Sequence, residues 1–214
     1  MFAGLLLPLL SQFWQTNDRA RFQNLMQQGF DAMSLLAWPI IVGTIFVAPD
    51  VMALIAGEEF RDAGMILQLL IFASALIFFK SVFAYAIVAL NKQKQTIWVY
   101  AITAVAGLIG YFWLIPIYGP LAAAGMTVAT EGIVAILIFL LYRKYSAVKT
   151  SIRRWIPAII SSLGMGVALW YVQDQHVILK ILIGVVVYGI VIILTRGVTK
   201  AFIKDLFTLR KFPA

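Results

Sequence analysis

Two ionisable residues stand alone inside long apolar stretches of this sequence. Lys80 is the only charged residue in FASALIFFKSVFAYAIVAL, and Glu131 is the only one in GMTVATEGIVAILIF. A charged side chain at the centre of a bilayer costs at least about 2.5–3.5 kcal/mol to insert, so such residues usually pair or serve a pathway. An amine and a carboxylate in these positions could attract an anion, bind a cation or proton, or neutralise each other.

The composition indicates that membrane-spanning helices must position these two side chains. The 214 residues are 63% hydrophobic and 12% charged, whereas soluble domains are about 45–50% apolar and about 25% charged. A bilayer span needs roughly 20 apolar residues. Six candidate segments, of which the fifth is the shortest, cover residues 33–56, 63–90, 95–117, 119–142, 155–172 and 177–195. The predicted fold is an all-α polytopic membrane helix bundle.

Several classes of function are disfavoured by what the sequence lacks. It has no cysteine, and His176 is its one histidine, so neither a thiolate or histidine metal site nor a Ser-His-Asp triad is expected. We therefore predict no cofactor, no metal and no enzymatic activity. The short outer loops also argue against a membrane glycosyltransferase or polymerase. Despite the net charge of +8, no nucleic-acid partner is expected, because the basic residues flank apolar spans instead of forming a soluble face.

The distribution of basic residues orients the bundle. If residues 11–32 lie in the cytoplasm and the spans alternate, Lys80 and Lys180 fall within spans and Arg61 falls on the outer side. The other lysines and arginines, out of 17 in the chain, all fall on the cytoplasmic side. This distribution satisfies the positive-inside rule. It predicts a multi-pass protein of the inner (cytoplasmic) membrane with a cytoplasmic C-terminus.

The sequence further divides the chain into six parts. Residues 17–31 carry apolar side chains at helical spacing, and Asn17 or Asp18 can cap the start of a helix. We expect that helix to lie on the membrane surface, with a solvated connector as the alternative. The six parts are a truncated helix end (1–10), a cytoplasmic amphipathic connector (11–32), a four-helix core (33–142), a basic cytoplasmic loop (143–154), two accessory transmembrane helices (155–195) and a basic cytoplasmic tail (196–214).

The two isolated charges are expected at nearly the same depth in the membrane. Lys80 lies ten residues before the end of its segment at Leu90, and Glu131 lies eleven before Tyr142, with both segments running from outside to inside. At a rise of 1.5 Å per residue they should differ by no more than about one turn. A direct or water-bridged ion pair inside the bundle follows. The alternative to a functional pair is a buried pair that only fixes helix register.

The remaining charged residues are expected at the membrane surfaces. Asp50 and the turn GEEF-R-D are predicted to form a solvated outer loop, and Lys180 is predicted to extend its amine to the interface from a helix end. His176 is expected on the surface. Arg21 could contact phosphates at the cytoplasmic mouth of a pathway, although attraction to lipid headgroups explains it equally well.

Four fragments, in this order and spacing, resemble one family. They are LLLPLLSQFWQTNDRARFQNLMQQG, WPIIVGTIFVAPDVMALIAGEEFRDAGMILQLL, ALNKQKQTIW and IPIYGPLAAAGMTVATEGI. The chain resembles the polysaccharide-export branch of the multidrug/oligosaccharidyl-lipid/polysaccharide exporters, which includes O-antigen-type flippases. It is also similar to flippases of lipid-linked peptidoglycan precursors. Members have two six-helix lobes facing a central cavity, and this chain resembles the end of the eighth helix through the fourteenth.

The resemblance implies that the chain is the C-terminal part of a flippase and that an N-terminal lobe is its missing partner. The implied substrate is a polyprenyl-pyrophosphate-linked oligosaccharide, moved across the cytoplasmic membrane for cell-surface polysaccharide synthesis. Lys80, Glu131 and Arg21 are the expected substrate-binding residues, with membrane lipids as further partners and possible H⁺ or Na⁺ coupling. The alternatives are a fragment of a cation-coupled multidrug antiporter, with Glu131 as its cation site, and a non-functional truncated protein. One lobe alone should not alternate access.

Overall fold

The protein is a bundle of helices. The computed structural model describes residues 2–146, 150–152 and 155–197, and the regular structure of these residues is entirely helical. The elements are α1 (Phe2–Gln15), α2 (Arg19–Ala56), the 3₁₀-helix η1 (Glu58–Ala63), α3 (Gly64–Ala89), α4 (Gln93–Tyr118), α5 (Pro120–Tyr145), α6 (Trp155–Tyr171) and α7 (Val177–Leu194). Parts of the predicted basic loop (147–149, 153–154) and of the tail (198–214) lie outside the described residues.

Hydropathy and helix length confirm a multi-pass membrane protein. Five of the described helices are long and apolar enough to cross a membrane: α2, α3, α4, α5 and α7. The apolar helix α6, with 17 residues, is shorter, as the weak fifth segment of the sequence predicts. The all-α polytopic fold is therefore confirmed.

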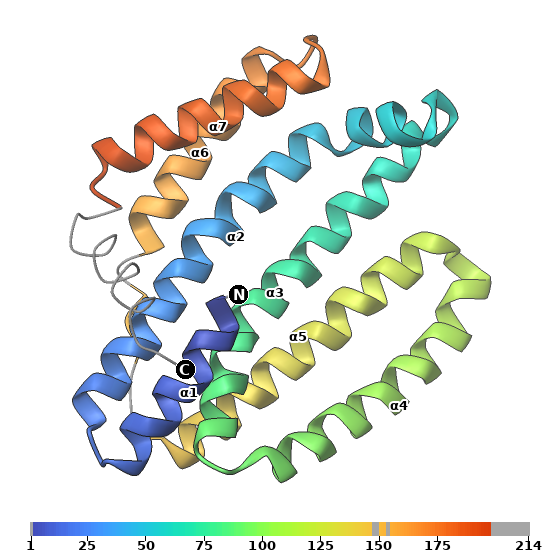
Figure 1. Cartoon of the computed structure of the whole chain (residues 1–214). Coiled ribbons are helices and arrows are strands. Elements are labelled where there is room, and N and C mark those ends of the chain that lie inside the picture. Colours follow the sequence, from blue (N-terminus) through green and yellow to red (C-terminus); the bar gives the residue numbers. More distant parts are fainter. Residues whose placement is uncertain (1, 147–149, 153–154, 198–214) are drawn as a thin grey trace.

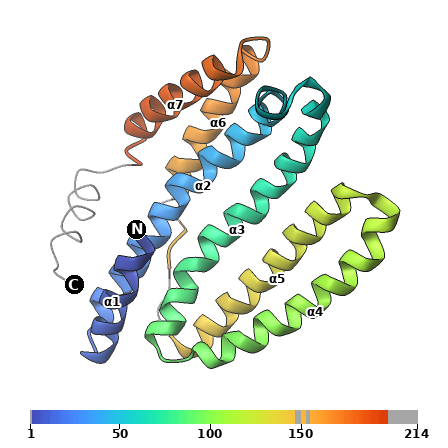
Figure 2. The same ribbon diagram turned by 45° about the vertical axis from the view of Figure 1, so that its right-hand side comes forward.

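The long helices lie side by side in a row. Helix α5 lies between α3 and α4, while α2 lies between α3 and the hairpin formed by α6 and α7 (Figures 1 and 2). Helix α1 packs against α2 and α3 at one end of the bundle. We call this the α1 end, and we call the opposite end, where η1 joins α2 to α3, the η1 end. The row leaves α4 at one edge and the α6–α7 hairpin at the other.

Helix α2 joins two segments that the sequence analysis separates. It runs without a break for 38 residues, a length of about 57 Å, so the predicted boundary between connector and span at residue 33 falls inside one helix. The sequence changes from polar to apolar near residue 33, and a change of hydropathy does not by itself end a helix. The N-cap is Asp18, whose Oδ1 accepts a hydrogen bond from the Arg21 backbone N–H at 3.0 Å, which confirms one of the two predicted caps.

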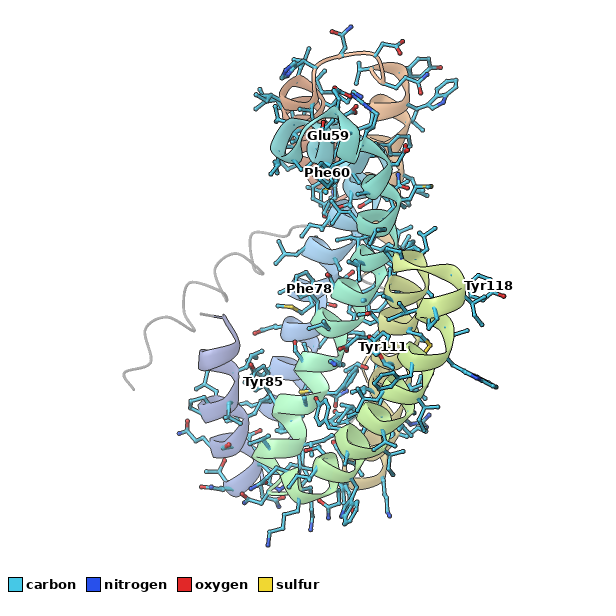
Figure 3. The ribbon with its side chains drawn as sticks, turned by 90° about the vertical axis from the view of Figure 1, so that its right-hand side faces the viewer. Glu59, Phe60, Phe78, Tyr85, Tyr111 and Tyr118 are labelled. Atoms are coloured by element: carbon cyan, nitrogen blue, oxygen red, sulfur yellow. The ribbon has the colours of Figure 1, made fainter. Side chains whose placement is uncertain are left out.

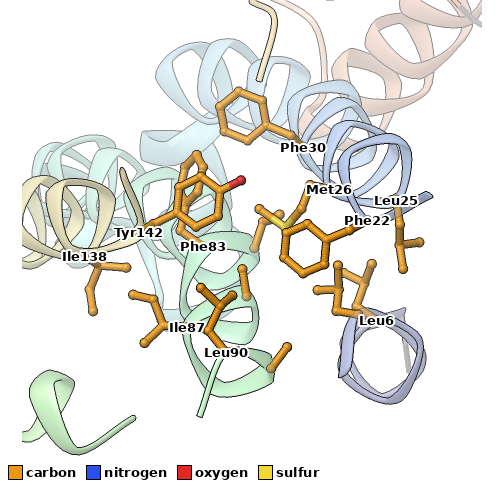
Figure 4. Close-up of a cluster of buried hydrophobic side chains, with 14 of the residues drawn as sticks. Leu6, Phe22, Leu25, Met26, Phe30, Phe83, Ile87, Leu90, Ile138 and Tyr142 are labelled. Atoms are coloured by element: carbon orange, nitrogen blue, oxygen red, sulfur yellow. The ribbon is translucent and has the colours of Figure 1, made fainter. Parts of the chain in front are cut away.

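The apolar stripe at the start of α2 is buried in protein and does not lie on a membrane surface. Phe22, Met26 and Phe30 are at most 6% exposed and belong to the main core cluster, together with side chains of α1, α3 and α5 (Figure 4). Leu6 and Leu10 of α1 cover the stripe. The helical periodicity predicted from the sequence is correct, but the apolar partner of the stripe is α1 instead of lipid.

At the η1 end, α3 begins in very close contact with α2. A Cβ atom added to Gly64 would lie 2.5 Å from Pro49 Cα and 2.6 Å from Pro49 N. These are backbone atoms, so a larger residue cannot be accommodated by a side-chain rotation. The contact fixes the outer turn and therefore the relative positions of α2 and α3.

Candidate functional site

The two isolated charges of the sequence meet between α3 and α5. The Lys80 Nζ and the Glu131 Oε2 form an ion pair, with side-chain exposures of 11% and 24%. Because α3 and α5 are neighbours in the row, residues at equal distances from their helix ends lie at equal depth. The ion pair predicted from that depth is confirmed.

An aromatic ring of the edge helix completes the surroundings of the amine. The Lys80 Nζ lies 5.6 Å from the centroid of the Tyr100 ring on α4, within the range of a cation–π interaction. Three neighbouring helices therefore each supply one group to the site. The amine has a carboxylate on one side and a π face on another, which lowers the free energy of a charge at this depth.

A cavity of about 410 Å³ opens beside this pair, between α4 and α5. Glu131 lines it, whereas Lys80 does not, so the carboxylate separates the amine from the open space. The bundle is seen in side view in Figure 3, where Phe78 of α3 and Tyr111 of α4 both lie near the middle of its height. The lining residues are Tyr100, Thr103, Ala104, Gly107, Leu108, Tyr111, Thr130, Glu131 and Val134.

Three of the hydroxyl groups on the cavity wall, those of Thr103, Tyr111 and Thr130, are already hydrogen-bonded. Thr103 Oγ1 donates to the Val99 carbonyl at 2.8 Å, and Thr130 Oγ1 donates to the Met126 carbonyl at 2.9 Å. Tyr111 Oη and Thr127 Oγ1 share a hydrogen bond of 2.9 Å between α4 and α5. The Glu131 carboxylate is the charged group among the residues that line this cavity.

The arrangement around Glu131 permits ionic exchange. Within residues 2–146, 150–152 and 155–197, no three His, Asp or Glu side chains cluster as metal ligands would. A carboxylate that pairs with an amine and also borders a cavity can bind a proton or a monovalent cation, which releases the amine. The freed ammonium group can then attract an anion.

Arg21 is not brought to this site. It lies in the first turn of α2 with 72% of its side chain exposed, and its Nε lies 3.3 Å from Asp18 Oδ2. Lys80, by contrast, is in the second half of α3 and nearly buried. A substrate role for Arg21 stays a prediction about the α1 end and does not concern the cavity.

A second charged network lies at the η1 end, where sequence analysis predicted a solvated loop and an extended lysine. The turn is solvated as predicted, because residues 58–62 are all exposed. Asp50, by contrast, lies within α2 with 23% of its side chain exposed, and the prediction for Lys180 is wrong. Lys180 is 5% exposed, and its Nζ contacts Asp50 Oδ2 at 2.5 Å. Arg61 Nη1 contacts Asp50 Oδ1 at 2.6 Å, and Arg61 Nε contacts Glu58 Oε2 at 2.9 Å.

The sequence contained one signal for this network. Asp50 and Lys180 are charges of opposite sign that stand within apolar runs near the same predicted end of the bundle. The depth argument applied to Lys80 and Glu131 would have paired them. The two residues are separated by 130 positions, however, and only the packing of α7 on α2 brings them together.

Comparison with known proteins supports the fold and leaves the family open. No protein-family profile matches the chain. No curated protein matches its sequence either. The structure is similar to that of lipid II flippase MurJ in an inward closed conformation, with a TM-score of 0.70 and 20% sequence identity. The match covers 97% of this chain and 44% of that one. The chain therefore has the fold of less than half of that flippase.

Proposed function

We propose that this chain is one lobe of a flippase that moves a polyprenyl-pyrophosphate-linked oligosaccharide across the cytoplasmic membrane for cell-surface polysaccharide synthesis. The observation that carries the proposal is the Lys80–Glu131 ion pair beside a cavity, on a fold similar to 44% of lipid II flippase MurJ. Transport by alternating access needs one body to move against another. The proposal therefore includes a second lobe as partner.

In the proposed mechanism the ion pair opens and closes during the cycle. A proton or Na⁺ that reaches the cavity binds the Glu131 carboxylate, and the bond to Lys80 is lost. The free ammonium group then attracts the pyrophosphate of the substrate. Return of the carboxylate to its charged, unoccupied form restores the pair and expels the anion. Arg21, exposed at the α1 end, gives the pyrophosphate a first contact at the cytoplasmic surface.

A second candidate function rests on the same carboxylate. In a cation-coupled multidrug antiporter, Glu131 would bind the coupling ion and the cationic drug in turn, and Lys80 would hold the carboxylate ready between these events. The observation in favour of this second candidate is that Glu131 lines the cavity whereas Lys80 does not. The two functions differ in the sign of the cargo, and cargo sign can be measured.

The test is complementation of a flippase-deficient strain by this chain alone and by this chain with an N-terminal lobe of a related flippase. We expect rescue by the pair of lobes and no rescue by the single chain. Lys80→Ala should abolish rescue. Lys94→Ala is the matched control, because Lys94 lies exposed at the start of α4 and should leave rescue unchanged.

A double variant separates a working pair from a pair that only fixes register. Lys80→Met with Glu131→Leu replaces both charges by apolar side chains of similar size, and such a replacement is often neutral or stabilising for the fold. If the pair is only structural, the double variant will still rescue growth. The proposal expects a well-folded protein and no rescue.

The remaining outcomes decide between the alternatives. Resistance to cationic drugs that Glu131→Gln removes, without flippase rescue, would support the antiporter. Failure of every well-expressed combination in both assays would contradict the proposal and leave a non-functional truncated protein or a different transporter.

A further inference from the structure

A second, larger cavity opens at the η1 end. It has a volume of about 650 Å³, within the range of small-molecule sites. Its walls come from the end of α2, from η1, from the turn between α6 and α7 and from the start of α7, so it shares no lining residue with the cavity beside Glu131. Eight of its lining residues are polar or charged: Asp50, Glu58, Arg61, Gln173, Asp174, Gln175, His176 and Lys180.

The cavity is lined by three carboxylates and two basic side chains, so one carboxylate exceeds the number of cations. The Arg61 guanidinium uses Nε and Nη2 on Glu58 and Nη1 on Asp50. Lys180 uses one of its three N–H donors on Asp50. Asp174 has no ion-pair partner in the part of the chain that the structure describes, and it lies exposed at the rim. The cavity thus offers a free carboxylate together with unused donors on a buried amine.

The residues around the cavity are those expected at the depth of a membrane interface. Aromatic residues gather at this depth in membrane proteins. Phe60 lies at the η1 end (Figure 3) and is 49% exposed, and Trp170 and Tyr171, at the end of α6, are 57% and 76% exposed. Leu54 lines the cavity and is itself 57% exposed. Alongside, α7 exposes Ile178, Leu182 and Val185, which share one helix face. Polar groups that bind a headgroup therefore stand next to apolar surface that can contact acyl chains.

We propose that this cavity binds the headgroup of a zwitterionic phospholipid with a primary ammonium group, such as phosphatidylethanolamine. The ammonium group donates hydrogen bonds to the Asp174 carboxylate and to the remaining lone pairs of the Glu58 oxygens, each of which also accepts one hydrogen bond from Arg61. The phosphate accepts hydrogen bonds from the unused donors of Lys180. Ammonium and phosphate in one ligand match the two signs of charge in the cavity, and the lipid seals the crevice between the α6–α7 turn and η1.

The test is native mass spectrometry of the full chain with lipids of identical acyl chains. Phosphatidylethanolamine should bind about tenfold more tightly than phosphatidylcholine, because a quaternary ammonium group cannot donate a hydrogen bond, and a charge-assisted bond accounts for a factor of this size. Phosphatidylglycerol, which has no cation, should bind as weakly as phosphatidylcholine. Asp174→Asn should remove the preference without disturbing the Asp50–Lys180 contact. Glu59→Gln is the matched control, because Glu59 lies exposed in η1 outside the cavity lining.

Three results would overturn the proposal. They are equal binding of the three lipids, an unchanged preference in a folded Asp174→Asn protein, and equally tight binding of water-soluble glycerophosphoethanolamine, which carries the headgroup without acyl chains. Folding of each variant is checked by circular dichroism. Because the test requires no transport, its result is independent of the proposed flippase activity.

Discussion

At the scale of single residues, Gly64 has the tightest steric requirement among those that shape the η1 end. A methyl group there would lie 2.5 Å from Pro49 Cα, a distance at which backbone atoms must separate. The contact lies next to Asp50, so the charged network and the α2–α3 turn depend on the same close approach. A single methyl group therefore tests how rigidly this end of the bundle is packed.

We expect Gly64→Ala to destabilise the folded protein by about 1–3 kcal/mol, the range for overpacking of a filled interior. The measurement is thermal unfolding in detergent, followed by circular dichroism. Gly125→Ala is the control: a Cβ atom at Gly125 meets nothing within 4 Å, and alanine favours a helix over glycine by up to about 1 kcal/mol. An unchanged unfolding temperature for Gly64→Ala would show that α3 can shift away from Pro49.

Prediction for single residues is correct where the depths of two opposite charges are compared, and it is wrong where each charge is interpreted alone. Lys80 and Glu131 were paired correctly because both were measured from helix ends that turn out to be neighbours. Asp50 and Lys180 were each explained by their nearness to an interface, and the burial of Lys180 at 5% exposure was missed. Tertiary packing determines which helices are neighbours, and the pattern of one sequence does not reveal it.

At the scale of elements, polar contacts attach α7 to α2 at both ends of their interface. One is the Lys180–Asp50 contact. The other is a hydrogen bond of 2.8 Å from Tyr188 Oη to the Leu35 carbonyl. Since apolar helices gain no hydrophobic free energy by leaving lipid for one another, hydrogen bonds of this kind and close packing hold such helices together.

We expect Tyr188→Phe to loosen α7 without unfolding the bundle, with a loss of about 0.5–1.5 kcal/mol for one hydrogen bond. Hydrogen exchange of the α7 amides should become faster, while exchange in α3 and α5 should not change. Tyr171→Phe is the control, because Tyr171 is 76% exposed. Equal exchange in the Tyr188 variant and the wild-type protein would show that packing alone holds α7.

Element-scale prediction was accurate for the spans and less accurate at the N-terminal end. The apolar segments gave helices close to their predicted limits, because span length is fixed by the bilayer. The predicted connector merged with the first span into α2, and its apolar stripe found α1 as partner. Hydropathy distinguishes lipid-facing from water-facing segments, but it does not distinguish lipid from a neighbouring helix.

At the scale of the whole molecule, the orientation in the membrane stays a prediction from the charge distribution. It places the η1 end outside and the α1 end in the cytoplasm. The absence of cysteine from the sequence makes the chain a ready background for single-cysteine labelling. Glu59 in η1 and Lys94 at the start of α4 are both exposed, and they lie at opposite ends of the bundle.

We expect a membrane-impermeant maleimide to label Glu59→Cys in intact cells and to label Lys94→Cys only after the membrane is made permeable. The physical reason is the positive-inside rule, because the basic residues concentrate at the end that carries Lys94. The reverse labelling pattern would invert the topology and place the proposed lipid site in the inner leaflet.

The edge position of α4 has a consequence for how the protein is made. Helix α4 packs mainly on α5, yet it leaves the ribosome before α5 has been synthesised. During that interval its exposed side chains, among them Trp98 and Trp113 at 71% and 78%, have only lipid or the insertion machinery as neighbours. The two helices are joined through a single glycine, Gly119, at a φ of +64°. Helices α4 and α5 should therefore insert into the membrane together as a hairpin. Lys80 of α3 should form its ion pair with Glu131 only when that hairpin packs against α3.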